Sequence, residues 1–270
     1  MLRARLLTGM ILLPLTFGVI VAGGWALTMA LLVALGIGGW EIVRALQAAG
    51  YPLRLPLVIG GIAALLLSRA LSLPPEAFTG GVSAFLIVAF GMMVATYSTG
   101  EVTAPIVFGL HLAVVIYVGW LGMHLIALRA LPDGFAWSII VVFGTAYGDV
   151  GAYFFGRVFG RHKLSPRLSP NKTWEGYWGG AVTAAVMTAI TAAALTASAP
   201  TVSTVEGLLI GGVLGVLTPL GDLGMSVFKR FGNVKDFSRV LGGHGGMMDR
   251  FDTILIGAAV GYYLIILLCL

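Results

Sequence analysis

Four polar side chains near the C-terminal end of the sequence are spaced so that they can act together. Asp222 is followed by Ser226, Lys229 and Arg230 at intervals of four, seven and eight residues. On an α-helix this spacing places all four side chains on one face. A carboxylate beside ammonium and guanidinium groups suits the binding of a metal ion together with phosphate oxygens.

Two further aspartates begin the last apolar run of the chain. Asp249 and Asp252 are three residues apart, so on a helix they share a face. Mg²⁺ in proteins is bound by oxygen atoms, usually one or two carboxylates, with water and substrate phosphates completing its shell. A single cysteine, Cys269, excludes an internal disulfide and a CxxC metal site. The residues therefore predict Mg²⁺-assisted chemistry on phosphate, with these two aspartates and Asp222 as candidate ligands.

A glycine-rich run precedes Asp249. Residues 242–246 read GGHGG, and the backbone N–H groups of such a run can surround an anion. The run leads into the N-terminus of the last predicted helix, where the helix dipole also favours phosphate. His244 can contact phosphate, shuttle a proton or orient the loop, and the pattern is compatible with all three roles.

A second basic loop reads RHKLSPRLSPNKTWEGYWGG, residues 161–180. Its Ser-Pro-Asn sequence, residues 169–171, predicts a turn and a helix start, with Lys172 and Thr173 in the first helical turn. Two interpretations stay open. Either the aromatic side chains anchor the loop in the headgroup layer, or Lys172 recognises an anionic lipid headgroup or a nucleotide phosphate.

Two of the acids lie inside apolar runs. Asp149 and Asp222 each occupy a segment in which an unpaired carboxylate is costly. Each therefore pairs with a neighbouring helix or has a functional role. Small residues on either side predict close helix packing there: Gly148, Gly151, Gly221 and Gly224.

Three other polar residues in apolar runs have simpler explanations. His111 and His124 are expected to form hydrogen bonds between helices rather than to bind a ligand. Glu41 is expected at the end of the second span, in an ion pair with Arg44.

The elements that carry these residues must lie in a membrane. The hydrophobic fraction is 59% and only 10% of residues are charged, whereas soluble domains are about one quarter charged. We expect an all-α, polytopic fold of about nine transmembrane helices, with eight as the alternative because the first two runs are short. The start resembles a secretory signal but is interpreted as the first retained helix. The predicted spans are 7–22, 24–39, 56–72, 80–98, 104–128, 135–156, 179–198, 206–228 and 253–270.

The distribution of basic residues orients these spans. With nine spans and a cytoplasmic N-terminus, fourteen of the sixteen Lys and Arg residues lie on the cytoplasmic side. Ten of them lie in two loops, 157–178 and 229–252. We therefore expect a cell-membrane protein with its active site at the cytoplasmic helix ends. Residues 1–130 are expected to form a membrane scaffold and residues 131–270 a catalytic part.

The segment from Ser226 to Asp252, SVFKRFGNVKDFSRVLGGHGGMMDRFD, resembles the signature of the phosphatidate cytidylyltransferases, or CDP-diacylglycerol synthases. SPNKTWEG resembles a second segment of that family, with Asn171 in place of a lysine, and DVGAYFFGR is similar to a third. The resemblance covers about residues 140–270. The residues that fill the signature are Ser226, Lys229, Arg230, Lys235, Asp236, His244, Gly245, Gly246, Asp249, Arg250 and Asp252.

The resemblance implies a multi-span enzyme that transfers the cytidylyl group of CTP to phosphatidic acid, giving CDP-diacylglycerol and pyrophosphate. It implies a homodimer and a Mg²⁺ cofactor, with potassium associated with the same site. It assigns the metal to Asp222 and Asp249, and the helix spacing keeps Asp252 as a third candidate. The expected catalytic residues are Asp222, Asp249, Lys229, Arg230 and His244. The expected substrate-binding residues are Lys172, Asn171, Ser226, Lys235, Asp236, Gly245, Gly246 and Arg250.

Two alternatives belong to other classes of function. A CTP-dependent lipid kinase would transfer the γ-phosphate instead of the cytidylyl group. An ion-coupled transporter would use Asp149 and Asp222 as a relay, but it predicts polar groups along the whole membrane depth. The charges of this chain are concentrated on one face, which favours an enzyme.

Overall fold

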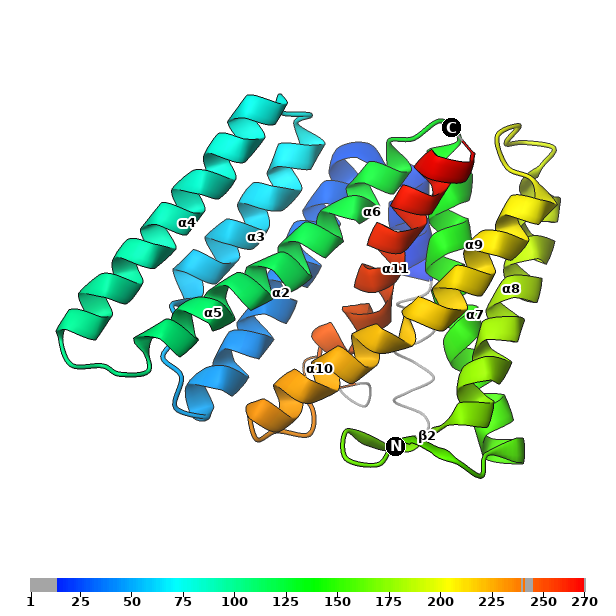
Figure 1. Cartoon of the computed structure of the whole chain (residues 1–270). Helices are drawn as coiled ribbons and strands as arrows, with labels where there is room; N and C mark the ends of the chain where they lie inside the picture. Colours follow the sequence, from blue (N-terminus) through cyan, green and yellow to red (C-terminus); the bar gives the residue numbers. More distant parts are fainter. Residues whose placement is uncertain (1–13, 239, 241–244, 270) are drawn as a thin grey trace. The chain divides into compact units, whose positions relative to one another are not determined.

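The structure is a computed structural model that describes residues 14–238, 240 and 245–269. His244 and part of the first apolar run lie outside the described residues. Helices dominate the described chain (Figure 1). Their bounds are α2 Gly24–Ala48, α3 Leu55–Ala70, α4 Pro75–Ser98, α5 Ala104–Val114, α6 Leu121–Arg129, α7 Gly134–Phe159, α8 Trp174–Leu195, α9 Thr204–Leu217, α10 Pro219–Phe231 and α11 Met248–Leu268.

Seven helical segments among the described residues are long and apolar enough to cross a membrane. One of them, Ala104–Arg129, joins α5 and α6 through a π-helical segment, η1 (Val115–Trp120), and another, Thr204–Phe231, joins α9 and α10. The apolar α3 is shorter, with 16 residues, and residues 14–22 are also helical. The chain is therefore a multi-pass membrane protein, and the count of nine spans stays a prediction.

The described residues form two compact units. The first unit contains Gly24–Ile126 and Phe228–Asp249. Within it α2 packs on α3, and α3 packs on η1. A Cβ on Gly119 would lie 3.0 Å from the Cα of Ile62, so the glycine lets η1 approach the backbone of α3.

The second unit contains Thr16–Gly23, Ala127–Val227 and Arg250–Leu270. Its centre is a tight group of three helices, α7, α8 and α9. Small residues allow their close approach, as expected for helices packed in a membrane. A Cβ on Gly211 of α9 would lie 2.6 Å from the carbonyl oxygen of Ala184 in α8, and one on Gly180 of α8 would lie 2.7 Å from the carbonyl oxygen of Gly148 in α7.

A β-hairpin connects α7 to α8, where the sequence predicted a helix start. Strand β1, Lys163–Ser165, pairs antiparallel with β2, Ser169–Thr173. The expectation that Lys172 and Thr173 lie in the first turn of the helix is therefore wrong. Thr173 is instead the N-cap of α8, because its hydroxyl accepts a hydrogen bond from the N–H of Gly176 at 3.2 Å.

The prediction that helices pack closely at the glycines beside the acids is correct at three of four positions, Gly148, Gly151 and Gly221. A Cβ on Gly151 would collide with the side chain of Thr183, and one on Gly221 would collide with the carbonyl oxygen of Asp252. A Cβ on Gly148 would make ordinary contacts, with its nearest neighbour, the Cβ of Ala184, at 3.7 Å. Among the described residues, no atom lies within 4 Å of a Cβ on Gly224, so Gly224 does not pack closely against any of them.

Candidate active site

Lys229 and Asp249 form an ion pair in the first unit. The Nζ of Lys229, in the last turn of α10, lies 2.9 Å from Oδ1 of Asp249, in the first turn of α11. Both side chains are largely buried, with 14% and 11% of their side-chain surface exposed. The ammonium also lies 5.8 Å from the ring centre of Phe237. Limited access to water strengthens this pair relative to an exposed one.

The turn before α11 is held by carboxylates. Oδ2 of Asp249 accepts a hydrogen bond from the N–H of Gly246 at 3.0 Å. Gly245 adopts a φ of +80°, and a Cβ there would lie 2.9 Å from the same oxygen, so glycine is needed on both counts. The N–H of Gly246 therefore binds a protein carboxylate, and the predicted phosphate-binding role of these two glycines stays untested.

The side chain of Glu41 in α2 also binds this turn. The predicted ion pair between Glu41 and Arg44 is wrong. Glu41 lies inside α2, which continues to Ala48, and it is fully buried. Its carboxylate accepts hydrogen bonds from Ser238, Met247 and Met248. Arg44 instead lies over the ring of Trp40, 5.8 Å from its centre. The partners of Glu41 are about two hundred residues away in sequence, so helix spacing could not identify them.

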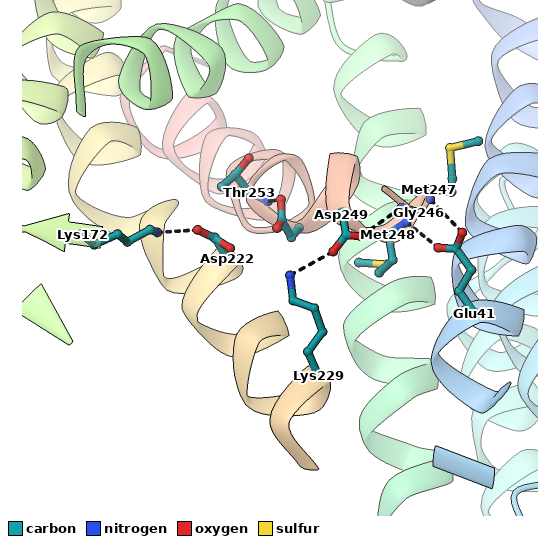
Figure 2. A network of polar contacts seen from close by, with 10 residues as sticks. Glu41, Lys172, Asp222, Lys229, Gly246, Met247, Met248, Asp249 and Thr253 are labelled. Atoms are coloured by element: carbon teal, nitrogen blue, oxygen red, sulfur yellow. Dashed lines mark hydrogen bonds and ion pairs between the residues drawn. The ribbon is translucent and has the colours of Figure 1, made fainter. Parts of the chain in front are cut away.

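A second ion pair lies in the second unit. The Nζ of Lys172, in β2, lies 2.7 Å from Oδ2 of Asp222, in the first turn of α10 (Figure 2). About one third of each side chain is exposed, 28% for the lysine and 33% for the aspartate. Asp222 thus has the neighbouring cationic partner that a carboxylate in an apolar segment requires.

Asp149 extends this second group. Its Oδ2 accepts a hydrogen bond from Oγ1 of Thr253 at 3.3 Å. It also interacts electrostatically with Lys172, Asp222 and Arg250. The sequence identified Asp149 as an acid that needed a partner, and the structure supplies the hydroxyl of Thr253 in α11.

The remaining predicted residues occupy varied positions. Ser226 and Asp252 are buried, and Oδ1 of Asp252 accepts a hydrogen bond from the N–H of Thr253 at 2.8 Å. Five further predicted site residues are exposed to solvent: Asn171, Arg230, Lys235, Asp236 and Arg250. Exposed cations are accessible to a soluble anion, whereas a buried serine contacts a ligand only through a local opening.

The candidate ligands carry the carboxylate oxygens that Mg²⁺ prefers, but the described residues do not include a preformed cluster of metal ligands. Within the described part of the chain, no three His, Cys, Asp or Glu side chains gather as metal ligands. Asp222 and Asp249 each face a lysine ammonium instead. Because Mg²⁺ commonly takes only one or two protein carboxylates and completes its shell with water and phosphate, such acids are sufficient.

The two histidines of the fifth apolar run differ in their partners. Nε2 of His111 accepts a hydrogen bond from the backbone N–H of Arg54 at 2.8 Å, linking α5 to the start of α3. This confirms the predicted structural role. Nδ1 of His124 lies 2.8 Å from the carbonyl oxygen of Trp120, a contact within the same continuous helical segment.

Comparison with known proteins identifies the family. The profile of the Cytidylyltransferase family matches residues 3–268. A phosphatidate cytidylyltransferase of Mycobacterium bovis is 32% identical, with 99% of this chain and 89% of the relative covered. Proteins of the same name from Pseudomonas aeruginosa and Bacillus subtilis are 33% and 32% identical, covering 94% and 98% of this chain and 93% and 98% of their own length. The chain therefore belongs to the cytidylyltransferase family.

Proposed function

We propose that this protein transfers the cytidylyl group of CTP to phosphatidic acid, giving CDP-diacylglycerol and pyrophosphate. The observation that carries the proposal is the similarity, along almost the whole chain, to proteins named phosphatidate cytidylyltransferase. The two Lys–Asp pairs support it, because both involve residues of the family-like segments.

The reaction is an in-line displacement at phosphorus. A phosphate oxygen of phosphatidic acid attacks the α-phosphorus of CTP, and the bond to the bridging oxygen of pyrophosphate breaks. Phosphatidate is already anionic at neutral pH, so the attack requires positioning and charge compensation more than a strong base. No proton-transfer role for a histidine is needed.

The cationic residues compensate the charge of the phosphates. Lys229 and the exposed Arg230, Lys235 and Arg250 are assigned to the triphosphate, and Lys172 is assigned to the lipid phosphate. A lysine that already balances a carboxylate can also donate to a phosphate oxygen, since its ammonium carries three N–H donors. Removal of one such donor from a phosphoryl-transfer site commonly lowers kcat about 10²-fold or more.

We assign the metal to Asp222 and Asp249. The chemistry that Mg²⁺ supplies when bound is charge compensation on the phosphates of CTP and on the leaving pyrophosphate. Asp252, which is buried, is kept as a third candidate ligand. A potassium ion in the same site is part of the proposal only through the family resemblance.

The location of the reaction follows from its substrates. Phosphatidic acid presents its headgroup at the membrane surface, and CTP comes from the cytosol. We propose that the protein lies in the cell membrane with its N-terminus and both basic loops on the cytoplasmic side, and that it is a homodimer. Light scattering of the purified protein in detergent measures this oligomeric state.

The decisive test combines labelled CTP with two variants. Purified protein is incubated with phosphatidic acid, Mg²⁺ and CTP labelled at the α- or γ-phosphate. Label from the α position is expected in the lipid product, and label from the γ position in pyrophosphate. Asp222→Asn and Asp249→Asn are each expected to lower kcat at least about 100-fold, because each removes a charged ligand.

Three outcomes would redirect the proposal. Transfer of the γ label to the lipid would identify a CTP-dependent lipid kinase. Full activity in either folded asparagine variant would remove that residue from the metal site. Ion flux in sealed vesicles, without product formation, would favour the transporter.

A further inference from the structure

Glu41 is a carboxylate in a place where a carboxylate is costly. It lies in the apolar helix α2 and has 0% of its surface exposed. Among the described residues no ion pair involves it. A buried charge of this kind is tolerated when hydrogen bonds satisfy its oxygens.

Both oxygens of Glu41 are used, and the donors come from one short region. Oε1 accepts from the N–H of Met247 at 2.9 Å, and Oε2 accepts from the N–H of Met248 at 2.9 Å (Figure 2). The hydroxyl of Ser238 also donates to Oε1. One side chain of α2 thus binds two successive backbone amides at the start of α11.

These amides are the ones that a helix leaves unsatisfied. Met248 is the first residue of α11, and the first N–H groups of a helix have no partner within it. A carboxylate there satisfies them and interacts favourably with the helix dipole. Glycine permits this approach, because a Cβ on Gly246 would lie 2.6 Å from Oε2 of Glu41.

The same turn carries Asp249. The amide just before the two bound by Glu41, that of Gly246, donates to Oδ2 of Asp249. The other oxygen of Asp249 lies 2.9 Å from Nζ of Lys229. Three consecutive amides are therefore bound by two carboxylates, and one of these is a candidate metal ligand. Met248, fully buried, packs against α2, where a Cβ on Gly38 would lie 3.2 Å from its sulfur.

We propose that Glu41 is a positioning residue of the active site: it holds the 246–249 turn on α2 and so fixes the orientation in which Asp249 meets Lys229. The inference rests on the proposed function for its kinetic consequence. Its structural content, a turn held by a distant carboxylate, can be measured without turnover.

The test is Glu41→Gln in the purified full-length protein. A glutamine has one carbonyl oxygen, and its NH₂ group would face an amide donor, so at least one of the two amides loses its partner. Hydrogen exchange of the peptide that contains Met247 and Met248 is expected to accelerate about tenfold or more. We expect kcat to fall about tenfold or more, while KM for phosphatidic acid changes less than about twofold.

Glu206→Gln is the matched control. Glu206 forms a capping box at the start of α9, where Oε2 accepts from the N–H of Ser203 at 2.9 Å. The control makes the same chemical change at another helix start. It is expected to leave kcat and the exchange of the 246–249 turn unchanged.

Each result has a defined meaning. Wild-type kcat and exchange in Glu41→Gln would overturn the inference, and so would an equal loss of kcat in Glu206→Gln.

If Glu41→Gln does not fold, Glu41→Asp is measured instead. It keeps the charge but is one methylene shorter, so an intermediate kcat is expected, and a wild-type value would overturn the inference. If the wild-type protein forms no CDP-diacylglycerol, the proposed function fails, and amide exchange still decides whether Glu41 holds the turn.

Discussion

At the residue scale, two ion pairs join side chains that come from different elements of the chain, Lys229 with Asp249 and Lys172 with Asp222. Lys229, Asp249, Lys172 and Asp222 were all predicted site residues. Helix spacing placed Asp222 and Lys229 on one face, yet in the structure each pairs with a residue from a different element. Pairing depends on tertiary packing, which local periodicity does not contain.

Glu41 was missed for a related reason. The sequence offered Arg44 as a local partner, and a pair three residues apart was a sufficient explanation. The available signal was the GGWE sequence, in which Gly38 and Gly39 allow other segments to approach α2. A buried acid beside such glycines indicates a distant hydrogen-bonding partner.

Lys229→Met tests the more buried of the two ion pairs. The change keeps the length of the side chain but removes the ammonium, which leaves the carboxylate of Asp249 with the N–H of Gly246 and without its cation. We expect kcat with CTP and phosphatidic acid to fall about 100-fold. Steady-state kinetics of the purified variant measure this.

Lys163→Met is the control for Lys229→Met. Lys163 is an exposed residue of β1 outside the candidate site, and its loss is expected to change kcat less than about twofold, since exposed charges contribute little. A wild-type kcat in Lys229→Met would show that this ammonium does not serve the reacting phosphates.

At the element scale, hydropathy located the helices well and the connections poorly. Most long apolar runs correspond to helices, because a span needs about twenty apolar residues whatever its partners. The β1–β2 hairpin was missed because Ser169-Pro170-Asn171 is also a typical helix-start pattern. Strand pairing with Lys163–Ser165 decides the structure there, and a strand of three residues leaves little periodicity to detect.

Glycines of α10 show what small-residue spacing cannot distinguish. Gly221 and Gly224 are both small and close to Asp222. Of the two, only Gly221 closely approaches another helix of the described chain, and a Cβ there would meet the main chain of Asp252 and Thr253 in α11. The sequence pattern predicted the same role for both.

Gly221→Ala and Gly224→Ala are therefore expected to differ in sign. The first introduces a methyl group where the carbonyl oxygen of Asp252 lies, so α10 must shift from α11, and overpacking of this kind costs about 1–3 kcal/mol. The second meets no atom of the described residues and replaces glycine in a helix, which stabilises by up to about 1 kcal/mol. Thermal unfolding in detergent and the activity assay measure both. Equal loss of stability in the two variants would contradict the packing described.

At the scale of the whole molecule, composition determined the class of protein. A chain with 59% hydrophobic and 10% charged residues cannot form a water-facing surface, and seven described segments can span a membrane. The orientation of the spans across the membrane was predicted from the distribution of the basic residues alone. This prediction concerns function directly, because CTP from the cytosol can meet a lipid phosphate bound by Lys172 only if the hairpin that carries this lysine is cytoplasmic.

Cysteine labelling tests this orientation along a single helix. Pro166 lies in the hairpin before α8, and Ser198 lies in the turn after it; both are exposed. Since α8 has 22 residues, it is about 33 Å long, enough to separate the two positions by the hydrocarbon core. In a Cys269→Ala background, Pro166→Cys is expected to react with a membrane-impermeant maleimide only in inside-out vesicles, and Ser198→Cys only in intact cells. Labelling of both from one side would mean that α8 does not cross the membrane. The reverse pattern would place the hairpin outside, where a lipid phosphate bound by Lys172 could not meet cytosolic CTP. Complete labelling of both variants in detergent would show that each thiol is reactive.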